Sequence, residues 1–233
     1  MVRALKEAIL TRPRLYDFLN NRRPIRDPVE QFLDSLGDRR SFVQIGASDG
    51  LRGDPLRQFV IGRHWSGTLV EPLPGVFRLL ERNYASRPDL TLVNAAITDS
   101  SSFQMWSFSD AFLAPLSEHD RLYYLRKASL HKDQVLRAVD GDEQKITQVR
   151  VETMGVNELL TEHFHQAELD LLMIDAEGHD ADIIMSIDFE VSRPGNILFE
   201  AHSIDSFPQL RRHLEDQGYS VSSLDGDAVA ILQ

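Results

Sequence analysis

The chain has 233 residues, of which 42% are hydrophobic and 26% charged, the balance of a soluble globular protein that can bury its own core. It contains no cysteine, which excludes disulfides, thiolate metal sites and cysteine nucleophiles and fits a cytoplasmic location. The net charge of −11 disfavours binding to nucleic-acid backbones, and the sequence has no run of about 18 apolar residues that would predict a membrane span.

Residues 1–39 are predicted to form a helical arm ahead of the main domain. Asp27 fits an N-cap, Pro28 the first position of a short helix over 28–36, and Gly37 its end. Residues 1–40 carry nine Lys and Arg against six Asp and Glu. This basic cluster could contact an anionic group of a substrate or partner, and a solvated helical surface is the alternative.

From residue 40 to residue 233, strand-like and helix-like segments alternate. This alternation predicts one α/β domain with a Rossmann-like, mostly parallel sheet and helices on both faces. The strands are expected at 41–45, 67–70, 90–94, 169–174 and 196–199, and the helices near 76–80, 155–164, 180–187 and 206–217. The last two segments, 219–223 and 227–232, are expected to form a closing antiparallel hairpin.

The middle of the chain departs from this alternation. Residues 103–108 alternate apolar and polar side chains, which predicts a hairpin strand at the edge of the sheet. We expect residues 110–146 to form a helical insertion that covers the site as a lid. In it, Tyr123 and Tyr124 either stack on a sugar or aromatic ring or belong to a local core. Residues 147–152 read as a strand or as the approach to the next helix.

The first chemical signal is the turn from Gly46 to Gly50, which directly follows the first predicted strand. In a doubly wound sheet, this turn lies at the carboxyl edge, where ligands bind, and glycine lets the backbone approach the ligand closely. We expect Asp49 in this turn to hold the ammonium group, or a water, at the amino-acid end of a methionine-like ligand.

The second signal is Glu71, which follows the second predicted strand. A carboxylate there can accept hydrogen bonds from both hydroxyls of an adenosine ribose, and a helix N-terminus is the alternative explanation. Asp49 would repel a pyrophosphate, and the Gly-x-Gly-x-x-Gly pattern of dinucleotide sites is missing. The sequence therefore favours S-adenosylmethionine over NAD. An NAD-linked oxidoreductase of similar fold and a catalytically inactive S-adenosylmethionine-binding module stay as alternatives.

The third signal is a group of acidic residues and a histidine that follow neighbouring strands. Asp175 comes after the fourth strand, and Glu200 and His202 come after the fifth. In one interpretation His202 or a carboxylate is the general base that takes a hydroxyl proton. In another, Asp175, Glu200 and His202 bind a divalent cation such as Mg²⁺, and purely structural roles are the third. His179, at a predicted helix start, either contacts the substrate or caps the helix.

These signals together resemble a known family. The Gly46–Gly50 turn, Glu71, residues 94–99 (NAAITD) and above all residues 174–180 (IDAEGHD) resemble the FkbM-type methyltransferases, whose hallmark is Ile-Asp-x-Glu-Gly at the end of the fourth strand. The resemblance covers roughly residues 40–110 and 147–233. It implies a class I methyltransferase fold, S-adenosylmethionine as methyl donor, and O-methylation of sugars, glycolipids or secondary metabolites.

The resemblance also implies which residues hold the cofactor. The glycine turn would line the methionine end, Glu71 the ribose, and residues 95–97 the adenine, with Asp175 and Glu177 near the reacting methyl group. The implied cofactor-binding set is Gly46, Ala47, Asp49, Gly50, Glu71, Pro72, Ala95, Ala96, Ile97, Asp175 and Glu177. We expect a small-molecule or glycan acceptor and no nucleic-acid substrate, and the sequence leaves homo-oligomerisation open.

Overall fold

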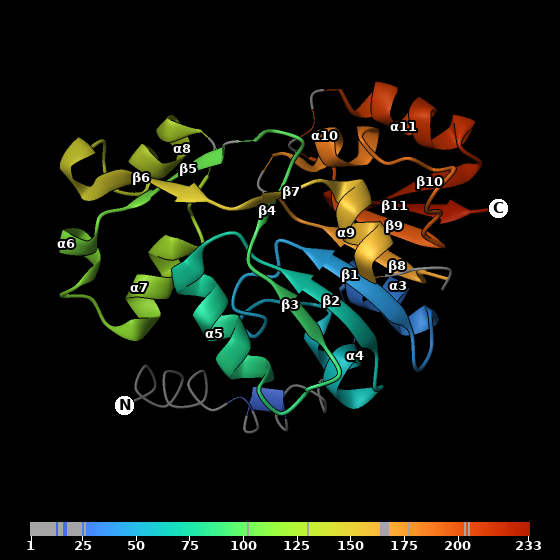
Figure 1. Cartoon of the computed structure of the whole chain (residues 1–233), viewed down its shortest axis with the longest axis horizontal. Helices are drawn as coiled ribbons and strands as arrows, with labels where there is room; N and C mark the ends of the chain where they lie inside the picture. Colours follow the sequence, from blue (N-terminus) through green and yellow to red (C-terminus); the bar gives the residue numbers. More distant parts are fainter. Residues whose placement is uncertain are drawn as a thin grey trace.

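The computed structural model describes residues 13, 16–17, 25, 27–101, 103–129, 131–163, 168–176, 178–202, 204 and 206–233. At its centre is a seven-stranded sheet with the order β10-β11-β9-β8-β1-β2-β3 (Figure 1). The strands are β1 (Ser41–Ile45), β2 (Ser66–Val70), β3 (Thr91–Val93), β8 (Leu171–Ile174), β9 (Asn196–Glu200), β10 (Tyr219–Leu224) and β11 (Asp227–Leu232). Strand β11 runs antiparallel to both of its neighbours, β9 and β10, and all other neighbouring strands of this sheet are parallel. The predicted fold, including the closing hairpin, is confirmed.

Helices cover both faces of the sheet, because alternate side chains of each strand point to opposite sides. In β1, Phe42 packs in a core with α3 (Pro28–Ser35), α4 (Arg57–Gly62) and α5 (Pro74–Tyr84). Its neighbour Val43 packs in the other core, with α9 (Val156–His163), α10 (Asp180–Met185) and α11 (Phe207–Asp216). None of the helices in the described ranges is long and apolar enough to cross a bilayer.

The entry into the sheet follows the predicted capping pattern. The Asp27 carboxylate accepts hydrogen bonds from the backbone N–H groups of Val29 and Glu30, at 2.9 and 3.3 Å, and Pro28 begins α3. The short helix α4 is not among the sequence predictions. Its N-cap residue, Leu56, makes no side-chain capping bond. The Asp54 carboxylate accepts a hydrogen bond from the backbone N–H of Leu56 at 2.9 Å, so Asp54-Pro55 is a start signal of the same kind as Asp27-Pro28.

The insertion between β3 and β8 carries its own small sheet. Strand β5 (Phe103–Phe108) pairs antiparallel with β6 (Ile146–Val151) apart from the central sheet, so its predicted place at the sheet edge is wrong. The physical reason is packing: Met105 joins a core with Leu122 and Val151, on segments far apart in sequence. Between the two strands lie α6 (Asp110–Leu113), α7 (Glu118–Leu125), α8 (Lys132–Arg137) and a 3₁₀ turn (Glu143–Lys145).

A second, very short ladder joins this insertion to the sheet. Strand β4 (Ala96–Ile97) pairs parallel with β7 (Thr153–Met154), directly after β3 and directly before α9. The backbone N–H of Ala96 donates to the carbonyl of Glu152 at 2.8 Å. The ladder therefore brings both ends of the insertion together at the carboxyl edge of the central sheet, as the ribbon also shows (Figure 1).

Candidate active site

A cavity opens at the carboxyl ends of β1, β2 and β8. It encloses about 810 Å³ of space, part of it open to solvent. Of the predicted cofactor-binding residues, it brings together Gly46, Glu71, Pro72, Ala95, Ala96, Ile97 and Asp175. Glu177 lies outside the described residues. Segments more than a hundred residues apart in sequence thus meet at one edge of the sheet.

Gly46 lets the ends of β1 and β8 close on each other. Its φ is +83°, and a Cβ at this position would lie 1.8 Å from the carbonyl oxygen of Asp175. A side chain here would collide with backbone that has no room to move. The backbone N–H of Asp175 donates to the carbonyl of Ile45 at 3.0 Å, so the two strand ends remain hydrogen-bonded at the floor of the cavity.

Asp49 does not line this cavity, unlike its predicted position. Its carboxylate is fully buried and accepts hydrogen bonds from the backbone N–H groups of Leu51 and Arg52 and from the Arg52 guanidinium, at 3.2, 3.0 and 2.9 Å. Because these partners lie within the turn itself, the carboxylate closes the turn. Ala47 and Gly50 are also absent from the lining, and a Cβ on Gly50 would lie 2.4 Å from the ring of Tyr84.

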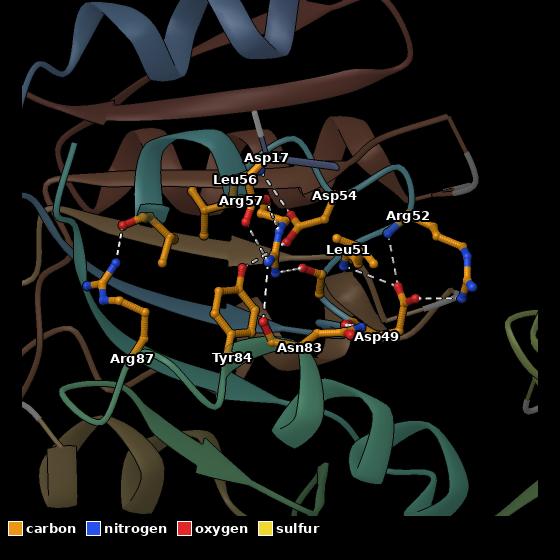
Figure 2. Close-up of polar contacts among 12 residues, drawn as sticks. Asp17, Asp49, Leu51, Arg52, Asp54, Leu56, Arg57, Asn83, Tyr84 and Arg87 are labelled. Atoms are coloured by element: carbon orange, nitrogen blue, oxygen red, sulfur yellow. Dashed lines mark hydrogen bonds and ion pairs between the residues drawn. The ribbon is translucent and has the colours of Figure 1, made fainter. Parts of the chain in front are cut away.

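A buried polar network fixes the path of this turn (Figure 2). The Arg57 guanidinium donates to the carbonyl of Gly50 at 2.7 Å and forms an ion pair with Asp17 at 2.6 Å. The side-chain amide of Asn83, on α5, donates to the carbonyl of Asp49 at 2.8 Å. Contacts from α4, α5 and the N-terminal segment therefore hold the backbone that faces the cavity.

Glu71 stands in the wall of the cavity with both carboxylate oxygens oriented by the backbone. Oε1 accepts a hydrogen bond from the N–H of Leu73 at 2.9 Å, and Oε2 accepts one from Ser48 at 3.0 Å. Burial, with the nearby carboxylates of Asp49 and Asp175, raises the pKa of Glu71 to about 7. A carboxylate has about four acceptor positions, so Glu71 keeps acceptor capacity for a ligand hydroxyl.

Much of the cavity wall is apolar. It includes Leu73, Val76, Ala95, Ala96, Ile97, Phe103 and Met105. Asn94 holds the backbone next to this wall, because its side-chain amide donates to the carbonyls of Glu71 and Pro72, at 2.7 and 3.1 Å. The lining therefore combines a few polar groups with a larger set of apolar side chains, as is common in small-molecule sites.

Asp175 lines this cavity and also a second, acidic one. The second cavity lies on the side of α3 and holds about 900 Å³ of partly open space. Its other carboxylates are Asp27, Glu30, Asp54, Glu200 and Asp227. Loss of solvation, together with repulsion from Glu200 and Asp227, raises the pKa of Asp175 to about 6. Asp175 thus stands where the two cavities meet.

His202, predicted as a possible base, lines neither of the two cavities. Its side chain is 65% exposed, and its Nδ1 lies 3.5 Å from Oε1 of Glu200. Across the described residues, no three His, Asp or Glu side chains are arranged to hold a metal ion. The predicted metal site at Asp175, Glu200 and His202 is therefore not formed, because the histidine points to solvent while Asp175 faces the cavities.

The structure instead brings His179 and Arg126 to the first cavity, the one lined by Gly46 and Glu71. His179 is the N-cap residue of α10 but makes no side-chain capping bond, and its Nδ1 lies 3.1 Å from Oδ2 of Asp182. The position of His179 directly after the acidic block is a sequence signal that could have ranked it above His202. Arg126 comes from the end of α7, where no motif marks it.

Asp180 supports the turn after β8 from inside the protein. Its side chain is fully buried, and Oδ2 accepts a hydrogen bond from the N–H of Ala176 at 3.2 Å. Its other oxygen, Oδ1, has no hydrogen-bond partner among the described residues. Burial and the charge of Asp175 raise the pKa of Asp180 to about 7. The site therefore contains three carboxyl groups whose charged forms are disfavoured, counting Glu71.

The sheet order, the reversed strand β11 and the cavity at the carboxyl edge define a Rossmann-like class I methyltransferase fold. The family model of the methyltransferase FkbM domain matches residues 44–221. The chain therefore belongs to the FkbM family of methyltransferases, which use S-adenosylmethionine as methyl donor. This assignment removes the NAD-linked oxidoreductase from the alternatives.

Solved structures with a similar fold are distant in sequence. Aeropyrum pernix fibrillarin, in complex with S-adenosyl-L-methionine, is 14% identical, with a TM-score of 0.44 over 84% of this chain and 68% of that chain. Precorrin-6y C5,15-methyltransferase from Geobacter metallireducens is 14% identical, with a TM-score of 0.43 over 90% of each chain. A Pyrococcus furiosus methyltransferase is 10% identical, with a TM-score of 0.42 over 88% and 82% of the two chains. No curated protein sequence gives a significant match.

Proposed function

We propose that this methyltransferase acts on a hydroxyl oxygen of a small molecule, a sugar or a secondary metabolite. The observation that carries the proposal is the position of Asp175, which lines both the donor cavity and the acidic cavity beside it. A methyl donor in the first cavity and an acceptor in the second would meet at this carboxylate. A carboxylate at that point can accept the proton of a reacting hydroxyl.

The residues of the donor cavity fit S-adenosylmethionine. Glu71 would accept hydrogen bonds from the ribose hydroxyls, and the apolar wall around Ala96 would hold the adenine. Ser48 lines the cavity from the turn between Gly46 and Gly50, and its Oγ is buried with no hydrogen-bond partner among the described residues. Such a group is costly unless a ligand satisfies it, which supports placing the methionine end there. The acidic surroundings favour a cationic ligand.

In this mechanism S-adenosylmethionine supplies an electrophilic methyl group. The chain's own contribution is to hold the acceptor oxygen in line, which is worth up to about 7–11 kcal/mol of the barrier. Asp175, with a pKa of about 6, is mostly ionised at pH 7.5 and can take the hydroxyl proton. Such a base contributes about 10²–10⁴-fold to the rate. Glu200, in the acidic cavity, would orient the acceptor.

We further propose that residues 40–233 form the methyltransferase domain and that the insertion at 110–146 is the lid. Support comes from Leu125, Arg126 and Ala128, which belong to the insertion and line the donor cavity. A lid that contacts the donor can exclude water and select the acceptor at the same time. The net charge of −11 supports a small acceptor over a nucleic acid.

The test measures S-adenosylhomocysteine formation with a panel of hydroxylated sugars and aromatic alcohols, matched with their amine analogues. We expect turnover with a hydroxyl acceptor, a loss of about 10²–10⁴-fold in kcat for Asp175→Asn, and a kcat that rises with pH through about 6. Asp216→Asn, an exposed site on α11, is the matched control. Turnover of amines alone would refute O-methylation. Tight S-adenosylhomocysteine binding without any turnover would instead favour an inactive binding module.

A further inference from the structure

The insertion carries a groove of its own outside the donor cavity. Its lining comes from the end of α7 and from α8, namely Tyr123, Arg126, Lys127, Gln134, Arg137 and Ala138. It holds about 1330 Å³ of largely open space. Figure 1 shows both α7 and α8 on the side of the molecule away from β10 and α11. Three of the six lining side chains are cationic, and none is acidic.

The side chains of this groove lie on the outer side of the insertion. Leu122 is buried and Leu125 half-buried in the core that α7 shares with the small sheet. Tyr123 on α7, and Arg126 and Lys127 in the turn that follows it, are exposed. The Nζ of Lys127 lies 5.0 Å from the centre of the Tyr123 ring, and this ring is 56% exposed.

Three other cations of the insertion form ion pairs: Lys132 with Glu143 at 2.9 Å, Arg137 with Asp133 at 3.8 Å and Lys145 with Asp142 at 3.2 Å. A fourth, Arg121, donates to backbone carbonyls of residues 113, 114 and 116. In the described part of the chain, neither Arg126 nor Lys127 has a carboxylate oxygen within 4.0 Å. Two adjacent cations without such partners stand out in a protein of net charge −11. They leave positive charge available for an anionic ligand.

The groove and the donor cavity share Arg126, which lines both. On the cavity side, the charge of Arg126 acts on Asp175 and lowers its pKa against the larger effects that raise it. The Arg126 guanidinium also lies beside Gly53, which lines the acidic cavity, since a Cβ on Gly53 would be 3.5 Å from it. A ligand bound along the groove would therefore pass Arg126 before reaching the acidic cavity. This continuity makes the groove a place for a part of the acceptor remote from the reacting hydroxyl.

We propose that this groove binds the phosphate group of a small phosphorylated acceptor. The inference rests on the proposed function, since it describes the acceptor of that reaction. Arginine pairs with phosphate through two parallel hydrogen bonds, and lysine adds a point charge. The exposed ring of Tyr123 offers a face on which a sugar can stack. The same two helices carry Glu118, Asp120 and Asp133, which would repel a polyanion that extends beyond the groove.

The experiment titrates the protein, saturated with S-adenosylhomocysteine, with glucose 1-phosphate and with glucose, by calorimetry and ³¹P NMR. Lys127→Gln and Arg126→Gln should each weaken binding of the phosphate about ten-fold, because each removes a charge-assisted contact. The matched control is Arg212→Gln, an exposed arginine of α11, which changes the net charge equally and should leave binding within about two-fold of wild type.

The readout does not depend on methyl transfer, so it separates this inference from the proposed function. Equal binding of glucose and glucose 1-phosphate would overturn the inference, and so would an equal effect of Lys127→Gln and Arg212→Gln. A single-stranded RNA oligonucleotide that binds far more tightly than glucose 1-phosphate, and loses that affinity in Lys127→Gln, would assign the groove to a nucleic acid instead. Unchanged S-adenosylhomocysteine affinity in Lys127→Gln is expected, since Lys127 does not line the donor cavity.

Discussion

Replacing Glu71 by glutamine tests the donor site most directly. In the structure, Oε1 and Oε2 each accept one backbone N–H, from Leu73 and from Ser48. Glutamine has nearly the same shape, but its NH₂ group would face one of these donors, and its charge is absent. The proposed hydrogen bonds to the ribose hydroxyls would lose an anionic acceptor. The variant therefore changes the chemistry of the site while leaving the volume of the side chain almost constant.

The size of the effect follows from the number and type of bonds. A hydrogen bond to a charged group is worth about 1.5–3 kcal/mol, which corresponds to about 10- to 150-fold in Kd. We expect Glu71→Gln to weaken S-adenosylhomocysteine binding within this range. Glu81→Gln, which alters an exposed glutamate on α5, serves as the matched control and should bind with the affinity of wild type.

The pH dependence gives a second, independent signature. The pKa of Glu71 is raised to about 7, so about half of the ligand-free protein carries a proton there at pH 7. The ribose hydroxyls favour the ionised form, and binding must then release that proton. Affinity should fall as pH falls below about 7, by at most about ten-fold per pH unit, with about half a proton released at pH 7. Glu71→Gln should abolish this dependence between pH 6.5 and 8.

Calorimetric titration with S-adenosylhomocysteine, in two buffers of different ionisation enthalpy, measures both the Kd and the number of protons released. This ligand lacks the sulfonium charge, so repulsion or attraction at sulfur does not enter the result. The reasoning is refuted if wild-type affinity is independent of pH, or if Glu71→Gln keeps both the affinity and the proton release of wild type. In either case Glu71 does not hold the ribose as an ionised acceptor.

Two further predictions concern stability. Gly46→Ala should destabilise the fold by more than ~3 kcal/mol, because its Cβ would lie 1.8 Å from the Asp175 carbonyl oxygen, whereas Gly75→Ala, with no atom within 4 Å, should be neutral or stabilising in thermal unfolding. Asp180→Asn should stabilise the protein. Because the pKa of Asp180 is raised from 3.8 to about 7 in the folded state, the wild-type free energy of unfolding falls as the pH rises through this window. Asparagine carries no charge and avoids this loss. The gain should be about 2–4 kcal/mol at pH 8 and clearly smaller at pH 5 in urea unfolding. An equal gain at both pH values would contradict that explanation.

The central sheet could be predicted from sequence because its signals are local. Three of the parallel strands are short apolar runs that end at a glycine or an acidic residue, at Gly46, Glu71 and Asp175. Strand ends of a parallel sheet meet at one edge, so predicting the strands also places these residues together. The structure brings all three to one cavity for this reason.

The remaining features depend on contacts that no local pattern records. The orientation of Asp49 is decided by backbone donors in its own turn and by Arg57 and Asn83, which come from later elements. His179 lines the cavity of Gly46 and Glu71 and His202 does not. This difference depends on the orientation of α10, which begins after β8. The pairing of β5 with β6 joins residues about forty positions apart, and only the packing of their shared core selects it.

Three acidic residues at the carboxyl edge of the sheet lie where their charged forms are disfavoured. Burial and mutual repulsion raise the pKa of Glu71 to about 7, of Asp175 to about 6 and of Asp180 to about 7. A fold selected for stability alone would place fewer carboxyl groups there, since each disfavoured charge lowers the free energy of unfolding near neutral pH. A cationic ligand in the cavity would offset this repulsion. The cost in the ligand-free protein is therefore best explained as preorganisation for a positively charged donor.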